Sequence, residues 1–131
     1  MHPLDTPSKP AFAHQDATRL PFPEVVDRLR ALLGNRLTAY IGGVQETRAV
    51  RQWAEGERVP GEVIQQRMRQ ALMAASMISE PDNAKIAQSW FQGANPKLDF
   101  QAPARLLRDA ADQQEAFSEV VAAAHAFVVS A

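Results

Sequence analysis

Apolar residues recur at intervals of three and four along most of this chain, the spacing that gathers side chains on one face of an α-helix. The helices predicted from it cover about 23–33, 61–79, 82–92, 103–107 and 113–128, with two shorter helices between residues 35 and 55. No segment alternates apolar and polar residues over a convincing strand length. The pattern therefore predicts an all-α fold.

Capping and helix-breaking residues mark the ends of these helices. Gly34 ends the first helix, and Pro60 is expected to open the long one, at a position where proline is tolerated. Ser79 or Glu80 is predicted to cap the helix that follows. Residues 112–115 form a capping box for the last helix.

The chain divides into three parts on its composition. Residues 1–22 carry four prolines among small polar residues, and cannot bury enough apolar surface to offset the entropy lost on ordering. We therefore predict a disordered tail over 1–22, a helical domain over 23–79 and a C-terminal helical domain over 80–131.

The two short helices between residues 35 and 55 suggest a function. Gly43 can adopt the positive φ of a tight turn between them, Ala39 leaves room for close approach, and Gly56 ends the second helix. Val50 and Trp53, three residues apart, face inward. This arrangement is typical of a helix-turn-helix. The residues expected to face outward and contact DNA are Thr47, Arg48, Arg51 and Gln52.

A small helical domain whose turn merely resembles the motif would show the same spacing. Arginine and glutamine on the outer face favour DNA binding, because their side chains contact phosphates and base edges. The segment from Arg28 to Arg69 has eight arginines against four carboxylates, a net charge of +4, whereas the chain from Gln70 onward carries −3. A basic half and an acidic half indicate two surfaces for two partners.

Candidate catalytic chemistry is absent from the sequence. The chain has no cysteine, which excludes disulfides and zinc–thiolate sites, and its three histidines lack the spaced partners of a metalloenzyme. We therefore expect a protein that is not an enzyme and holds no metal or cofactor. No apolar run approaches the roughly 20 residues that span a bilayer, and no signal peptide opens the chain, so we expect a cytoplasmic protein.

The C-terminal half contains a second motif, SWFQGANPKLDFQAPARLLR, from Ser89 to Arg108. It resembles the C-terminal signature of the MbcA/ParS/Xre antitoxin family, in which a tryptophan opens a segment with Asn, Leu and Pro before a short Leu-rich helix and a final helix. The resemblance spans residues 24–131, although the stretch from Val44 to Trp53 is one residue longer than is usual in the family. The positions that define both motifs are Gly43, Trp53, Gly56, Pro60, Trp90, Asn95, Pro103 and Leu107.

The resemblance implies an antitoxin of a RES–Xre type II toxin–antitoxin system. Members of the family neutralise RES-domain toxins, which consume NAD⁺, by covering the active-site cleft with the C-terminal region, and they repress their own operon through the N-terminal domain. The implied partners are a cognate toxin, operator DNA and a second copy of the chain in a homodimer. The residues predicted to bind toxin are Asp109, Asp112, Glu115, Phe117, Val121, Phe127 and Val128. A stand-alone Xre-type regulator, whose C-terminal region only dimerises, is the alternative.

Overall fold

The structure, a computed structural model, describes residues 19–79 and 83–130. Its α-helices are α2 (Phe22–Leu33), α3 (Asn35–Gly42), α4 (Thr47–Ala54), α5 (Glu62–Ile78), α6 (Ala84–Gln92), α7 (Pro103–Asp109) and α8 (Gln113–Ser130), with the 3₁₀ helix η2 (Pro96–Leu98) between α6 and α7. Apart from an isolated bridge between Asn95 and Gln101, the regular structure in these residues is helical, which confirms the all-α prediction. None of the helices described combines the length and apolarity needed to cross a membrane.

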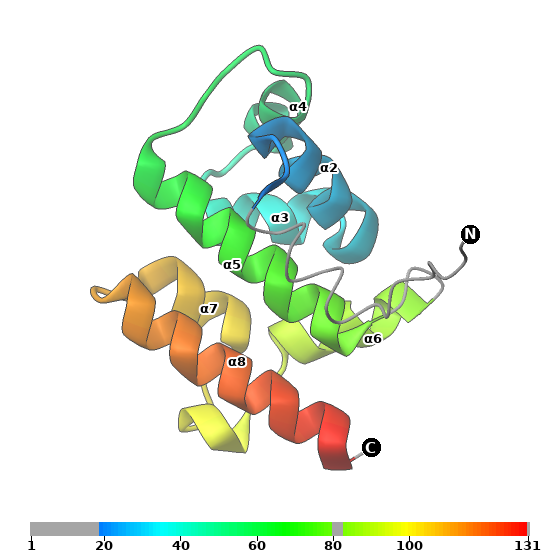
Figure 1. The fold of residues 1–131 in the computed structure, drawn as a ribbon, viewed down its shortest axis with the longest axis vertical. Helices are drawn as coiled ribbons and strands as arrows, with labels where there is room; N and C mark the ends of the chain where they lie inside the picture. The colour runs from blue at the N-terminus through cyan, green and yellow to red at the C-terminus, as the bar shows by residue number, and fades with distance from the viewer. Residues whose placement is uncertain (1–18, 80–82, 131) are drawn as a thin grey trace, which may run out of the picture.

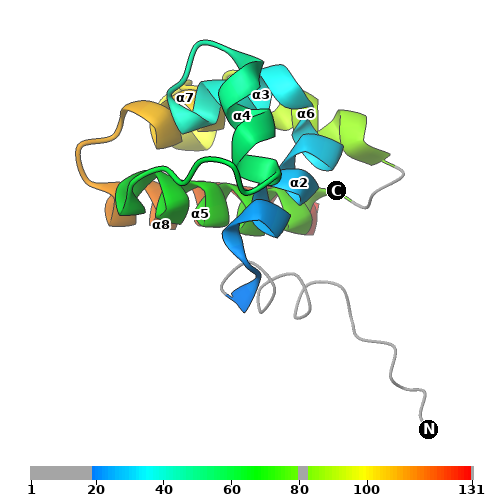
Figure 2. The same cartoon turned by 90° about the horizontal axis from the view of Figure 1, so that it is seen from above.

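The long helix α5 is central to the packing. It lies side by side with α8 (Figure 1) and also contacts α2 and α3. Seen from above (Figure 2), α5 and α8 form one layer, and α3, α6 and α7 lie in a second layer on one side of them. α4 packs on α2 and α3 at the end of the molecule away from α8.

One continuous core joins the two halves of the chain. Met68 of α5, Phe91 of α6 and Val120 of α8 are fully buried and belong to the same apolar cluster as Leu29 of α2. The boundary predicted at residue 79 therefore does not divide the core. The residues that immediately follow this boundary, 80–82, lie outside the described part of the chain.

The disordered tail predicted over 1–22 extends too far. Phe22 is the first residue of α2 and is buried, with its ring centroid 6.2 Å from that of Trp53. The backbone carbonyl of Leu20 accepts a hydrogen bond from Arg69 at 2.6 Å. The prolines around Phe22 misled the prediction because proline is tolerated in the first turn of a helix. The rest of the tail, residues 1–18, is outside the described residues.

Two predicted helix starts are displaced. α5 begins two residues after Pro60, whose carbonyl instead accepts a hydrogen bond from Nε2 of Gln65 at 2.9 Å. The N-cap residue of α6 is Asn83, and Ser79 follows the last residue of α5 rather than capping α6. Glu80, the other predicted cap, is not among the described residues.

Candidate nucleic-acid and protein interfaces

Helix α4 buries one face and exposes the other. Ala49, Val50 and Trp53 are buried, as the inward spacing of Val50 and Trp53 predicts. The four candidate DNA-binding residues lie on the remaining surface of the helix: Thr47, Arg48 and Arg51 are exposed, and Gln52 is half-buried. The structure thus brings these four side chains together on one short helix.

The turn before α4 and the turn after it have the same backbone geometry. Gly43 has a φ of 79°, and the N–H groups of Gly43 and Val44 donate to the carbonyls of Tyr40 and Ala39 at 3.0 and 3.1 Å. This pair of bonds is the Schellman motif, which ends a helix with a left-handed residue. Gly56, with a φ of 80°, forms the equivalent pair at the end of α4. Both glycines therefore have the role predicted for them.

Close approach between α3 and α4 depends on Gly42 rather than on Ala39 alone. A Cβ atom added to Gly42 would lie 2.9 Å from Cζ3 of Trp53, closer than side-chain carbons pack. The Trp53 ring therefore rests directly on the backbone of α3. The adjacent glycines at 42 and 43 were the available sequence signal: the second makes the turn and the first admits the ring.

The polar groups of α4 differ in how free they are to contact a ligand. Arg51 forms an ion pair with Glu55 at 3.0 Å, and Oε1 of Gln52 accepts a hydrogen bond from Arg58 at 3.3 Å. Arg48 makes no hydrogen bond or ion pair with the part of the chain that the structure describes. Arg48, Gln52 and Arg58 border one open groove of about 510 Å³. Arg58, which the sequence reasoning missed, therefore belongs to this surface.

Several of the eight arginines that make this half basic are engaged within the fold. Arg28 and Arg30 pair with Glu24 and Asp27 at 3.5 and 3.7 Å. Because Glu24 and Asp27 precede the segment counted above, these two contacts lower its effective positive charge below +4, whereas the ion pair of Arg51 with Glu55 is already included in that count. The outer face of α4 therefore depends on Arg48 and Arg58 for its charge.

Arg67 links three helices from a partly buried position on α5. Its guanidinium donates to the carbonyl of Ile41 at the end of α3, at 3.1 Å, and to Oε1 of Gln113 at the start of α8, at 3.3 Å. Burial lowers the pKa of Arg67, and the nearby charge of Asp109 partly opposes this. Because arginine titrates far above neutral pH, the group remains charged. Arg67 is thus a structural residue rather than a DNA contact.

Two of the three acids predicted to bind toxin have local partners. Oδ1 of Asp112 accepts a hydrogen bond from the backbone N–H of Glu115 at 3.0 Å, so Asp112 caps the start of α8 as the capping box predicts. Asp109 lies 3.7 Å from Arg105, one turn earlier on α7. The side chain of Glu115 is exposed. Asp109 and Asp112 are therefore engaged by neighbouring groups of the same chain.

The apolar residues predicted to bind toxin lie on two flanks of α8. Phe117 and Val121 are half-buried and Val128 is 45% exposed, and their spacing of four and seven places them along one line of the helix. Phe127 points to another flank, where its ring centroid is 6.4 Å from that of Trp90. The structure therefore brings together three of the four apolar candidates and separates Phe127 from them.

The four C-terminal motif residues support the fold. Trp90 is buried against Phe91, with 5.1 Å between ring centroids, and Leu107 is fully buried. Pro103 is the first residue of α7, and Oδ1 of Asn95 accepts a hydrogen bond from the N–H of Lys97 at 2.9 Å. The motif thus builds the α6–α7 region on which α8 packs.

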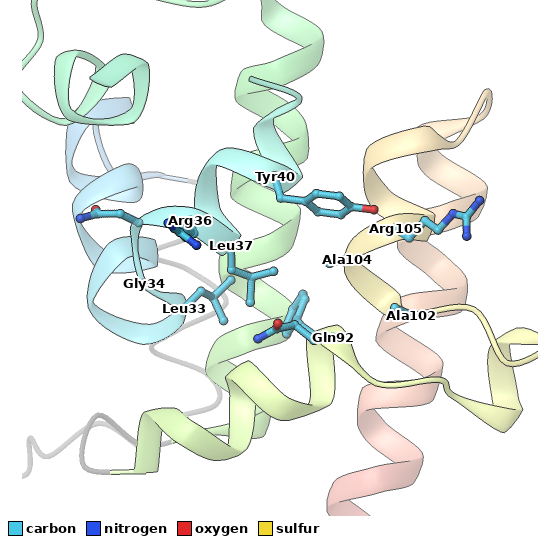
Figure 3. A pocket seen from close by; sticks show the side chains of 11 residues that line it. Leu33, Gly34, Arg36, Leu37, Tyr40, Gln92, Ala102, Ala104 and Arg105 are labelled. Atoms are coloured by element: carbon cyan, nitrogen blue, oxygen red, sulfur yellow. The ribbon is translucent and has the colours of Figure 1, made fainter. Parts of the chain in front are cut away.

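A pocket of about 650 Å³ lies between α3 and the α6–α7 region (Figure 3). Tyr40 reaches from α3 toward α7, and the guanidinium carbon of Arg108 lies 4.6 Å from its ring centroid. Such a cation–π contact joins the two predicted halves of the chain. No group of three or more His, Cys, Asp or Glu side chains that could hold a metal occurs in the described residues. The pocket lies at the boundary between the two predicted halves of the chain, and its ionisable lining residues are Arg36, Tyr40 and Arg105.

Comparisons of the chain with protein-family models, with curated proteins and with solved structures find no match. The family resemblance therefore rests on the motif residues themselves. Two surfaces described above are candidate binding sites: the outer face of α4, and the partly exposed line of Phe117, Val121 and Val128 on α8.

Proposed function

We propose that this chain is an antitoxin of a RES–Xre type II system, which inhibits an NAD⁺-consuming RES-domain toxin by steric blockage. The observation that carries the proposal is the line of Phe117, Val121 and Val128 on α8, which lies outside the core cluster: Val128 is 45% exposed, and Phe117 and Val121 are half-buried. Apolar side chains spaced by four and seven residues along one side of a helix are the pattern that binds in a hydrophobic groove of a partner protein. Glu115 is also exposed in the first turn of α8, but it lies two residues before Phe117 and projects from the other side of the helix.

A second activity, repression of its own operon, is proposed for the α3–α4 unit. In this proposal the unit is a helix-turn-helix, and α4 is the recognition helix that enters the major groove. It is supported by the exposure of Thr47, Arg48 and Arg51 opposite a buried Trp53, and by the groove that Arg58 shares with α4. One such unit reads a half-site, so the repressor is a homodimer on a roughly palindromic operator.

A stand-alone Xre-type regulator is the competing function. The α4 surface supports it equally well, because that surface needs no toxin. A regulator that dimerises through its C-terminal region could use the line on α8 as well, so what favours the antitoxin is the family-like motif from Ser89 to Arg108. A RES-domain reading frame beside the gene, co-expressed and co-purified with this chain, distinguishes the two functions.

The substitution Val128→Lys is expected to abolish protection of cells that express the RES-domain toxin. Val128 is exposed, so a lysine there is tolerated by the fold but introduces an unpaired charge into an apolar interface. The matched control is Val59→Lys, which adds the same charge at a side chain that is 74% exposed on the loop before α5. Growth of toxin-expressing cells and pull-down of the toxin measure the effect.

The same experiment distinguishes a wrong function from a wrong binding surface. If the unaltered chain gives no protection and does not retain the toxin, the antitoxin function is wrong. If both lysine variants protect fully, the chain is an antitoxin that uses a different surface.

Arg48→Ala is expected to weaken operator binding more than Arg51→Ala. Arg48 has no internal partner among the described residues, whereas Glu55 already neutralises Arg51. A base contact by Arg48 would cost about 1–3 kcal/mol at one operator position, and a phosphate contact would weaken all sequences alike and reduce the salt slope by about 1. Footprinting upstream of the gene at several salt concentrations measures this, with Arg105→Ala as the charge-matched control. Equal protection by the unaltered and Arg48→Ala proteins would exclude α4 as the reading helix.

A further inference from the structure

Two consecutive residues after η2 have left-handed backbone conformations that side chains disfavour. Asp99 has a φ of 56° and Phe100 a φ of 66°, and neither is glycine. Asp tolerates this region through its short polar side chain, but a bulky residue such as Phe is a genuine outlier there. Strain of this kind persists only where the surrounding structure enforces it.

Hydrogen bonds to Asn95 enforce the conformation. Its carbonyl accepts from the N–H groups of Leu98 and Phe100 at 2.9 and 2.8 Å, and its own N–H donates to the carbonyl of Gln101 at 3.2 Å. Leu98 is buried and anchors the loop in the core. The loop over 95–101 is thus a rigid closed turn that holds Phe100 in place.

The enforced conformation leaves Phe100 in solvent. Its side chain is 69% exposed, the most exposed aromatic ring among the large apolar residues described. The strain therefore contributes nothing to the burial of this ring within its own chain. A rigid, protruding aromatic ring is the kind of residue that dominates binding at protein interfaces.

A hollow that could receive such a ring lies beside the same loop. It has a volume of about 290 Å³ and is lined by apolar surfaces of Trp90, Pro96, Ala123 and Phe127. Asn95 and Pro96 contribute to its wall, and the backbone N–H of Phe100 donates to the carbonyl of Asn95 at 2.8 Å, so the hollow directly adjoins the residue that carries the protruding ring. A surface with a projection next to a matching hollow can pair with itself about a two-fold axis.

We propose that this face is the interface with a second copy of the chain, in which Phe100 of each protomer enters the hollow of the other. The charges on the loop favour self-association over an acidic or a basic partner. Lys97 and Asp99 are both exposed, and neither forms an ion pair with the described residues. In a two-fold arrangement Lys97 of one protomer meets Asp99 of the other, twice. The interface leaves the line of Phe117, Val121 and Val128 uncovered.

Phe100→Gly tests whether Phe100 is a contact residue. The substitution should stabilise the monomer and weaken the dimer, a combination that is not expected of a residue that only supports the fold. Glycine adopts the left-handed conformation without strain, so the melting temperature of the monomer should rise by about 2–8 °C, measured where every variant is monomeric. Loss of the ring should weaken dimerisation at least about 30-fold in sedimentation equilibrium. Val59→Ser, which removes an equally exposed apolar side chain elsewhere, should leave the dimerisation constant unchanged.

A charge exchange tests the two-fold pairing itself. Lys97→Glu should weaken the dimer by placing two like charges together, and the double variant Lys97→Glu/Asp99→Lys should restore it, because the exchanged loop is again self-complementary. A protein that stays monomeric across the micromolar range, a dimer that survives Phe100→Gly, or a double variant that does not recover would each overturn the proposal. None of these measurements involves toxin, so their outcome is independent of the proposed antitoxin function. A protein that stays monomeric would also contradict the homodimeric repressor proposed above, whereas the outcomes of the two variants would not.

Discussion

Truncation after Asp112 is expected to abolish the cooperative unfolding transition of the whole chain. The deletion removes α8, whose Val120 and Ala124 are fully buried in the core that α5 shares with α2. It also removes Gln113, which accepts a hydrogen bond from Arg67. Exposure of one side of α5 leaves a chain with helices but without a closed core, so the expected state is compact and loosely packed. Thermal melts followed by far- and near-ultraviolet circular dichroism measure the loss.

The control for this truncation is a shorter deletion of residues 128–131. Val128 and Val129 at its start are exposed, so little core is lost and the melting temperature should change by only a few degrees. If the chain truncated after Asp112 instead melts cooperatively near the temperature of the full chain, the N-terminal helices form a domain of their own, as the predicted division at residue 79 requires.

Trp53→Ala is expected to reduce the free energy of unfolding by about 3–5 kcal/mol. The indole is 2% exposed, packs on the backbone at Gly42 and contacts the ring of Phe22, so its removal leaves a cavity where α2, α3 and α4 meet. The loss is large against the roughly 5–15 kcal/mol that stabilises a typical domain. Urea denaturation at constant m-value measures it.

Thr47→Ala is the comparison on the outer face of the same helix, and should change the free energy of unfolding by no more than about 0.5 kcal/mol. A loss of less than about 1 kcal/mol in Trp53→Ala would mean that the site collapses around the missing ring or that the ring is not enclosed in solution. In either case, packing of the Trp53 ring would not be what holds α4 against α2 and α3.

The positions of the helices and the exposed face of α4 were predictable because both follow from local spacing. Val50 and Trp53 determine which side of α4 is buried, and glycine at 43 and 56 marks its turns. The helix partners were not predictable in this way. A periodic pattern shows that α8 has a buried face, but not that α5 covers part of it.

Two features of the candidate surfaces had no usable sequence signal. Arg67 looks like any other arginine of a basic segment, and only the fold brings it to the Ile41 carbonyl and Gln113. The left-handed conformation of Phe100 could not be predicted for a different reason. A positive φ is expected at glycine, and there is no glycine at this position. Long-range contacts and enforced backbone geometry therefore account for what the prediction missed.

The paired Schellman turns around α4 have a consequence for how this protein can diversify. The residues that hold the helix in place, chiefly Gly43, Gly56 and Trp53, are separate from those that face solvent at 47, 48 and 51. Substitutions at the solvent positions leave the turns and the core untouched. If α4 binds operator DNA as proposed, related chains could therefore acquire new operator preferences one residue at a time, with no compensating change elsewhere and no loss of the surface on α8.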